Sequence, residues 1–165
     1  MNIRRCELND ADNMLKMLLA LDKETDYMMF EADERPKDIN RVKDMINPSI
    51  NGDDLLLIAV EDENIIGFLS AQRGIPRKIK HTAYIVIGIR KNFRGNGIGK
   101  KLFLELDLWA KENNVSRLEL TVMCTNSIAK QLYEKNGFVV EGIKRNSIFM
   151  KGNYIDEYYM AKIYK

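Results

Sequence analysis

The segment with the clearest chemical potential is a glycine-rich turn between an apolar run and a helical pattern. It reads Arg94-Gly95-Asn96-Gly97-Ile98-Gly99-Lys100 and follows the β-branched run Ile85–Ile89. Glycines at alternate positions let the backbone present successive N–H groups without interference from Cβ atoms. The dipole of the following helix and the charges of Arg94 and Lys100 add positive potential there. The turn is therefore predicted to be an anion-binding site that fits a pyrophosphate.

The spacing of the glycines excludes two common nucleotide-binding motifs. The Walker motif needs four residues between its glycines and a Ser or Thr after its Lys. Here three residues separate Gly95 from Gly99, and Lys101 follows Lys100. The Rossmann pattern also fails, because the turn reads G-x-G-x-G and no acidic residue ends the next expected strand. A plain loop with capping glycines is the remaining alternative.

The hydrophobic periodicity predicts the elements that position this turn. Strands are expected at residues 2–6, 55–60, 65–71, 81–89, 117–123, 138–150 and 154–163. Helices are expected after Asp10, from Pro36 to about Asn47, at 97–113 and at 127–136. The strand–helix–strand order favours parallel pairing in the middle, and the hairpins favour antiparallel pairing at both ends. We expect an α/β fold with a single mixed sheet flanked by helices, in the order β-α-α-β-β-β-α-β-α-β-β.

Composition and charge exclude several classes of protein. The 165 residues are 45% apolar and 30% charged, and they contain no repeat or linker, so one domain over 1–165 is predicted. The 26 basic and 24 acidic residues leave a net charge of +2, which does not indicate a nucleic-acid or membrane-surface partner. No signal peptide and no 18-residue apolar run occur, so a cytoplasmic location is expected.

The cysteine and histidine content argues against metal and disulfide chemistry. Cys6 and Cys124 are too few for a disulfide framework, and no CxxC pair or second histidine accompanies His81. No metal is therefore expected. Both cysteines are interpreted as buried small residues rather than nucleophiles.

Several motifs together resemble one known family. Arg94-x-x-Gly97-x-Gly99 resembles the acetyl-CoA signature Q/R-x-x-G-x-G/A of the GNAT family of N-acetyltransferases. Ile87-Gly88-Ile89 lies at the family's offset before the Arg, Asn126 opens the next expected helix, and Leu132–Phe138 resembles its L-Y-x-K-x-G-F phrase. The order of elements agrees as well, so the resemblance covers nearly the whole chain. Phrases in the terminal hairpin are similar to the branch near ribosomal-protein and small-amine acetyltransferases.

The resemblance implies that the co-substrate is acetyl-CoA. The backbone amides from Arg94 to Lys100 would hold the pyrophosphate; these residues are Arg94, Gly95, Asn96, Gly97, Ile98, Gly99 and Lys100. Backbone groups of Ile87 and Ile89 would pair with the pantetheine arm like an added strand. The Ile89 N–H would donate to the thioester carbonyl, and Asn126 would reach the pantetheine from the other side.

The resemblance also suggests a general acid, whereas the general base stays open. Tyr133 lies seven residues after Asn126 on the same helix face and would protonate the departing thiolate. The alternative is that Tyr133 is a core aromatic. Some relatives carry a glutamate base at the position of Ala83. His81 lies two residues earlier on that strand face and is therefore a candidate base. His81 as a surface residue, the carboxylates of the first-helix connection (Glu24, Glu31 and Glu34) and ordered water are left open.

The acceptor is expected to be an amine. In the family, the first two helices and the terminal hairpin wall the acceptor pocket. Here that surface would include Tyr27, Phe30, Glu31, Glu34 and Arg35, facing Tyr154, Asp156 and Tyr158. Carboxylates there favour a cationic acceptor such as a small amine, a polyamine or a protein N-terminus, and a solvated charge run is the alternative. The predicted activity is acetyl transfer to a primary amine by direct attack in a ternary complex. The rival is a non-catalytic acyl-CoA-binding sensor or interaction module. The sequence leaves open whether the protein is a monomer or a homodimer.

Overall fold

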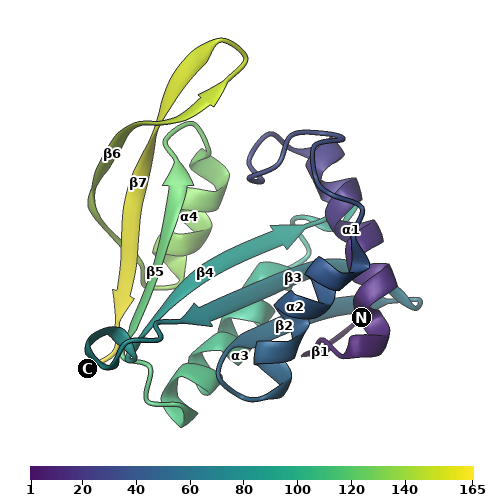
Figure 1. Ribbon diagram of the computed structural model, residues 1–165. Helices are drawn as coiled ribbons and strands as arrows, with labels where there is room; N and C mark the ends of the chain where they lie inside the picture. The colour runs from purple at the N-terminus through teal and green to yellow at the C-terminus, as the bar shows by residue number, and fades with distance from the viewer. The chain divides into compact units, whose positions relative to one another are not determined.

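The computed structural model describes all residues from Met1 to Lys165 and contains the predicted order of strands and helices (Figure 1). The strands are β1 (Asn2–Arg5), β2 (Leu55–Glu61), β3 (Asn64–Arg73), β4 (Thr82–Ile89), β5 (Arg117–Met123), β6 (Val139–Met150) and β7 (Asn153–Ile163). The helices are α1 (Ala11–Glu24), α2 (Ile39–Ile50), α3 (Ile98–Glu112) and α4 (Ser127–Lys135). Short 3-10 turns add η1 (Leu8–Asp10), η2 (Arg77–Ile79) and η3 (Lys91–Phe93).

The strands form one seven-stranded mixed sheet in the order β1-β2-β3-β4-β5-β7-β6. β4 and β5 pair in parallel, with Thr82 opposite Arg117. β1 with β2, β2 with β3, β5 with β7, and β6 with β7 pair in antiparallel fashion. The predicted α/β fold with a parallel middle and antiparallel ends is thereby confirmed. The insertion of β7 between β5 and β6 is an arrangement that the order of elements did not predict.

Both predicted hairpins close through two-residue turns with left-handed backbone. Asp62 and Glu63 have φ values of 48° and 63°, and Lys151 and Gly152 have φ values of 50° and 78°. Two consecutive positive φ angles are typical of the type I′ turn, whose twist matches that of the flanking strands. The turn chemistry thus sets the register of β2 on β3 and of β6 on β7.

The predicted bounds of the second helix were wrong at both ends. α2 begins at Ile39 rather than Pro36, because the Asp38 carboxylate caps it by accepting the Asn40 N–H at 2.9 Å. It continues through Pro48 to Ile50. Pro48 lies in the last turn of α2, and its missing N–H removes a single helical hydrogen bond. The helical hydrogen bonding continues beyond it, because the Asn51 N–H donates to the Asn47 carbonyl at 3.1 Å.

The chain packs into two compact units. The first comprises Met1–Gln72 with Val86–Trp109, and the second comprises Arg73–Ile85 with Ala110–Lys165. In the first unit, apolar residues of α1 and α2 pack against β2 and β3 in one buried cluster, which includes Met14, Leu21, Ile46, Ile58 and Phe68. A single functional domain over 1–165 stays a prediction.

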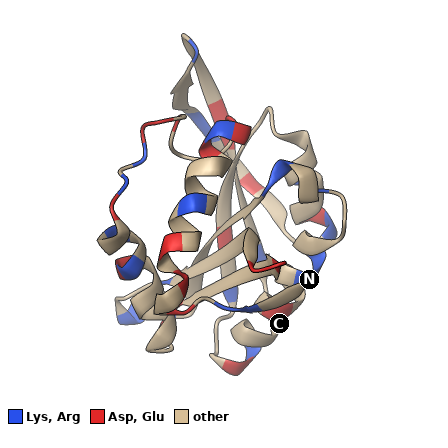
Figure 2. Ribbon diagram, turned by 90° about the vertical axis from the view of Figure 1, so that its right-hand side faces the viewer, with Lys and Arg blue, Asp and Glu red and all other residues tan.

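The charged residues are distributed along the whole chain. Figure 2 shows Lys and Arg segments interspersed with Asp and Glu segments on the helices and strands. None of the helices combines the length and the apolar character needed to cross a bilayer. No group of three or more His, Cys, Asp or Glu side chains is arranged to hold a metal ion.

Candidate active site

The glycine turn of the first unit presents a run of backbone donors without acceptors. The first α3 residue with a partner in the preceding turn is Lys101, whose N–H reaches the Gly97 carbonyl at 3.2 Å. The six N–H groups from Gly95 to Lys100 donate to no acceptor in the protein. The first N–H groups of any helix lack intrahelical partners, and here the turn adds further ones. These six amides are the donors that an anion would use.

The backbone of the turn explains why glycines occur at these positions. Gly95 and Gly97 have φ values of 79° and 76°, in the left-handed region that other residues rarely adopt. Alternation of right- and left-handed residues directs successive N–H groups into a common anion-binding concavity. Asn96 and Gly97 are exposed, whereas Ile98 is buried and anchors the start of α3 in the core. The geometry fits a bound phosphate.

Arg94 differs in detail from the sequence expectation. Its own N–H donates to the Lys91 carbonyl at 3.4 Å, so the open donors begin at Gly95 rather than at Arg94. Its guanidinium Nε donates to the Ile89 carbonyl at 2.9 Å. Arg94 therefore connects the turn to the end of β4 as well as adding charge.

The end of β4 places Ile87 and Ile89 on the face opposite to α1. Gly88, between them, is buried, and a Cβ there would lie 2.8 Å from the Leu21 Cδ1 and Phe68 Cε1 atoms. Only glycine allows this close packing of β4 on α1. Ile87 and Ile89 are half-buried.

The Glu24 carboxylate at the end of α1 anchors the backbone that leads into the glycine turn. Sequence reasoning did not predict this role. Glu24 Oε1 accepts from Arg90 Nε, and Oε2 accepts from the Lys91 N–H, both at 2.8 Å. Burial alone would raise the pKa of Glu24, but the Lys91 N–H and the Arg90 guanidinium outweigh it and hold the pKa below its usual value. Glu24 is therefore an ionised anchor, which does not suit the role of general base.

Removing this anchor is expected to destabilise the protein. Glu24→Ala should lower the free energy of unfolding by about 1.5–3 kcal/mol, the range for hydrogen bonds to charged groups. Urea denaturation measures this loss. The matched control is Glu112→Ala, since Glu112 also ends a helix, is exposed and has no hydrogen bond or ion pair. The control should stay within about 0.5 kcal/mol of wild type, and equal losses in both variants would contradict the anchoring role.

In the second unit, Asn126 begins α4 and caps it. Its side-chain oxygen accepts the Ala129 N–H at 3.2 Å, and its own N–H donates to the Met123 carbonyl at 2.8 Å. The side-chain NH₂ of Asn126 donates to no group of the protein. Capping therefore fixes the side chain and leaves two donors for a ligand.

Tyr133 is held in the core by the way α4 ends. Gly137 has a φ of 90°, and the Phe138 N–H returns to the Tyr133 carbonyl at 3.1 Å, which forms a Schellman-type end. The Phe138 ring then packs on the Tyr133 ring at 5.9 Å between centroids. Burial, and secondarily Tyr84, raises the pKa of Tyr133, so its phenol stays protonated at neutral pH.

His81 is exposed and immediately precedes β4. Its carbonyl accepts the Ser116 and Arg117 N–H groups at 2.9 and 3.1 Å, but its ring makes no hydrogen bond. Ala83, two residues later, is fully buried. The role of His81 as base stays a prediction, and the structure provides no group that orients its ring.

The connection between α1 and α2 carries the four predicted acceptor residues. Three of them are exposed, namely Tyr27, Glu31 and Glu34. Phe30 is half-buried, and the Arg35 guanidinium lies over its ring, 4.6 Å from the ring centre. Glu34 accepts the Glu31 N–H at 2.8 Å. Arg35 in turn forms a bidentate pair with Asp22 on α1, at 2.6 and 3.0 Å. The structure thus gathers the four residues in one connection that an ion pair fastens to α1.

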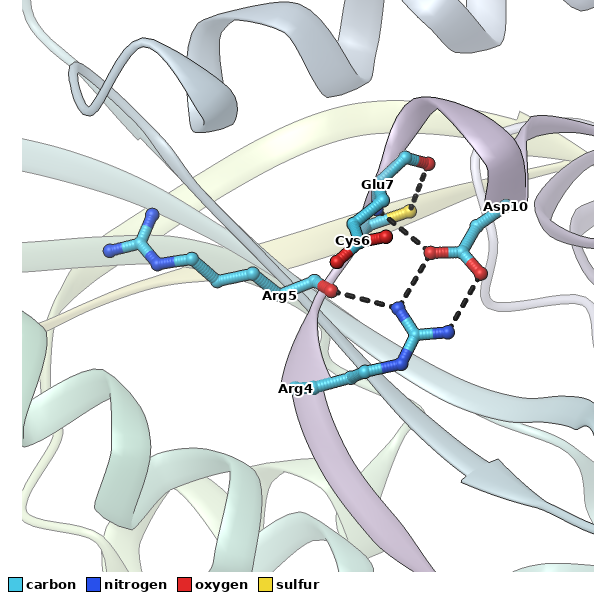
Figure 3. Close-up of polar contacts among 5 residues, drawn as sticks. All are labelled: Arg4, Arg5, Cys6, Glu7 and Asp10. Carbon is cyan, nitrogen blue, oxygen red and sulfur yellow. Dashed lines mark hydrogen bonds and ion pairs between the residues drawn. The ribbon is translucent and has the colours of Figure 1, made fainter.

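Cys6 is unsuited to carry an acyl group. It lies beside an Arg4–Asp10 bidentate pair at the start of the chain, with Asp10 also accepting the Glu7 N–H (Figure 3). Burial, and next the Asp10 carboxylate, raises the pKa of the Cys6 thiol to about 12. Nucleophilic attack requires the thiolate. The interpretation of Cys6 as a buried small residue is confirmed, whereas Cys124 is only half-buried.

Comparison with known proteins gives one consistent family. The model of the acetyltransferase (GNAT) family matches residues 16–138. The L-amino acid N-acetyltransferase of Escherichia coli (strain K12) is 31% identical over 111 residues, which cover 65% of this chain and 67% of that protein. The crystal structure of a GNAT acetyltransferase from Streptococcus pneumoniae is 28% identical, with a TM-score of 0.94 over 99% of both chains.

A further structure shows the same fold at lower identity. An acetyltransferase from Salmonella typhimurium, solved with its cofactor acetyl-CoA, is 18% identical, with a TM-score of 0.86 over 99% of this chain and 93% of that one. The family model covers the glycine turn, β5 and α4, which are the elements described above. The chain belongs to the GNAT family of acetyltransferases and is an N-acetyltransferase.

Proposed function

We propose that the protein transfers the acetyl group of acetyl-CoA to a primary amine by direct attack in a ternary complex. The observation that carries this proposal is the run of six unpaired N–H groups from Gly95 to Lys100. Such donors at a helix N-terminus suit the pyrophosphate of CoA. The acetyl-CoA found in the Salmonella typhimurium relative supports the same ligand.

The other cofactor contacts follow from the same proposal. Residues Arg94, Gly95, Asn96, Gly97, Ile98, Gly99 and Lys100 bind the pyrophosphate through backbone and charge. Ile87 and Ile89 pair with the pantetheine arm, as a ligand strand pairs with a sheet edge. The Asn126 NH₂ donates to the pantetheine amides.

The chemistry requires three actions from the protein. The Ile89 N–H donates to the thioester carbonyl, which stabilises the negative charge that develops on its oxygen. The amine nitrogen forms the new C–N bond after losing a proton, because an ammonium has no lone pair. The C–S bond then breaks, and Tyr133 gives its proton to the departing sulfur. The sequence offers His81 as proton acceptor.

The acceptor is proposed to be a cationic primary amine bound near Tyr27, Phe30, Glu31 and Glu34. The carboxylates Glu31 and Glu34 are exposed on the α1–α2 connection, which the Arg35–Asp22 ion pair holds in place. Exposed carboxylates attract a cation through their electrostatic field. Curated relatives include the L-amino acid N-acetyltransferase of Escherichia coli and a spermidine N(1)-acetyltransferase of Thermoplasma acidophilum. Small amines are therefore the first acceptors to test.

Ligand-induced stabilisation tests the proposed function. Acetyl-CoA and CoA at 100 times their dissociation constants should stabilise the fold by about 2.7 kcal/mol. That corresponds to a rise of about 5–10 °C in the melting temperature for a chain of this length. ATP and NAD should give no comparable rise. Stabilisation by all four ligands, or by none, would refute the acetyl-CoA assignment.

Turnover separates the enzyme from a non-catalytic acyl-CoA-binding module, which is the alternative. CoA release is measured with acetyl-CoA and a panel of amino acids, polyamines, small amines and peptides. An enzyme releases CoA only with its acceptors. Binding of acetyl-CoA without amine-dependent CoA release would favour the sensor. Tyr133 and Asn126 support the enzyme, because a module that only binds has no use for a proton donor.

A further inference from the structure

One carboxylate in the second unit is buried without any partner. Glu157 on β7 is 6% exposed, and its side chain makes no hydrogen bond or ion pair. The buried carboxylate of the first unit, Asp22, is by contrast paired twice with Arg35. An unpaired buried carboxylate costs stability, because protein interiors replace its hydration poorly. Glu157 therefore presents a largely buried carboxylate to which no group of the chain donates.

The register places Glu157 beside the residues that lead to Asn126. Met123, the last residue of β5, is the cross-strand partner of Glu157. The neighbouring Asp156 carbonyl accepts the Cys124 N–H at 2.9 Å, so β7 follows β5 past its end. Glu157 thus lies at the carboxyl end of β5, immediately before the segment that places the Asn126 side chain.

Glu157 also lies on the sheet face opposite to α4. The ring of Tyr158 faces α4, since Lys130 Nζ lies 5.5 Å from its centre. Side chains alternate along a strand, so Glu157 and Tyr159 point to the other face. There the cross-strand partner of Tyr159 is Thr121, whose hydroxyl bonds the Tyr84 hydroxyl at 2.8 Å. Tyr84 and Tyr159 are exposed, so a ligand can lie along this row and reach the carboxylate.

The surroundings favour a cationic partner. The Glu157 oxygens are not fully enclosed, in contrast to Ser147 Oγ, which is enclosed and has no hydrogen bond. Lys144 is the cross-strand neighbour on β6, but it forms no ion pair with Glu157. An ammonium group offers a positive charge and three N–H donors, which match a carboxylate that accepts no hydrogen bond from the chain.

We propose that Glu157 binds the ammonium group of the acceptor and takes the proton that the amine must lose. This assignment rests on the proposed acetyl transfer. It gives Glu157 the role of base in place of His81, and the role of binding the reacting ammonium in place of Glu31 and Glu34. One proton passes from the ammonium to the carboxylate, and the freed lone pair forms the C–N bond to the acetyl carbon. As the C–S bond breaks, Tyr133 protonates the sulfur, and the second nitrogen proton restores the Tyr133 phenol. Glu157 then releases its proton to water, and N-acetylamine and CoA remain.

The test compares a charged with an uncharged amine in Glu157→Gln. Benzylamine is an ammonium near neutral pH, whereas aniline is already neutral and has no proton to lose before attack. The variant should lower kcat/KM for benzylamine about 100-fold, at the lower end for general acid–base catalysis. For aniline the loss should be below about 3-fold, and KM for acetyl-CoA should not change. Equal losses for both amines, or no loss, would overturn the assignment.

The matched control is Glu134→Gln. Glu134 lies on α4 in the same unit, and the amide oxygen of Gln can still accept from Lys130 Nζ, as the Glu134 carboxylate does. This control removes the same charge and should keep both amine activities. Loss of benzylamine activity in the control would show a general charge effect on the second unit and would overturn the role of Glu157.

Two further measurements distinguish this assignment from the acetyl transfer on which it rests. Glu157→Gln should melt about 2–4 °C above wild type, since an unpaired charge is removed, whereas a carboxylate with a structural role would make it melt lower. Calorimetric titration of benzylamine into the CoA complex should show at least tenfold weaker binding to the variant. Weakened binding without turnover in wild type would refute acetyl transfer and keep the amine site. Unchanged binding would refute the amine site.

Discussion

Replacing Tyr133 with Phe is expected to lower kcat about 100-fold and to leave the dissociation constant of acetyl-CoA unchanged. The change removes one oxygen and keeps the ring that packs on Phe138. A proton donated only as the C–S bond breaks belongs to the transition state, so its loss appears in kcat. General acids contribute roughly 10²–10⁴-fold. The buried phenol has a raised pKa and is a weak acid, which favours the lower end.

The matched control for Tyr133→Phe is Tyr164→Phe, the same chemical change at a half-buried tyrosine that follows the end of β7. Single-turnover kinetics of acetyl transfer should show the loss only in the Tyr133 variant. The raised pKa also predicts that wild-type kcat does not fall through ionisation of this phenol as pH rises from 7 to about 10, the ordinary pKa of tyrosine. Wild-type kcat in the variant, with chemistry limiting turnover, would leave Tyr133 as a core aromatic only.

Gly97→Val is expected to weaken CoA binding at least tenfold, which is about 1.4 kcal/mol. A β-branched residue is a strong outlier at the φ of 76° that Gly97 adopts, so the turn must rearrange. A Cβ at Gly97 meets no protein atom within 4 Å. The new methyl groups therefore occupy the space in which a phosphate would approach the open N–H groups. Isothermal calorimetry with CoA measures the change.

The chain provides a closely matched control for this variant. Gly152, in the β6–β7 turn, has a φ of 78°, and a Cβ there also meets no atom within 4 Å. Gly152→Val imposes the same backbone strain far along the chain from the glycine turn. It should lower the melting temperature about as much as Gly97→Val and keep wild-type affinity for CoA. Equal losses of affinity would assign the effect to strain and exclude the pyrophosphate site.

Features that depend on a few consecutive residues were predictable from the sequence. The alternation of apolar residues predicted β5 at its observed bounds, and the run of three glycines predicted the donor-rich turn before α3. The L-Y-x-K-x-G-F phrase carries its own physical reason, since Gly137 ends α4 and returns Phe138 to Tyr133. The exception among local features was α2, where the Asp38 cap decided the start and Pro48 did not decide the end.

Which strands and side chains meet was decided by the tertiary structure. β7 lies between β5 and β6, and this order brings Glu157 beside Met123. The sequence left Glu24 as a candidate base. Its pairing with Arg90 depends on the packing of α1 against the end of β4, which the sequence does not report. Periodicity reports which face of an element is apolar, but it does not report which distant residue a charge meets. The local sequence around a glutamate therefore does not tell whether its carboxylate is paired or not. Glu24 accepts hydrogen bonds from Arg90 and Lys91, whereas Glu157 is buried without a partner.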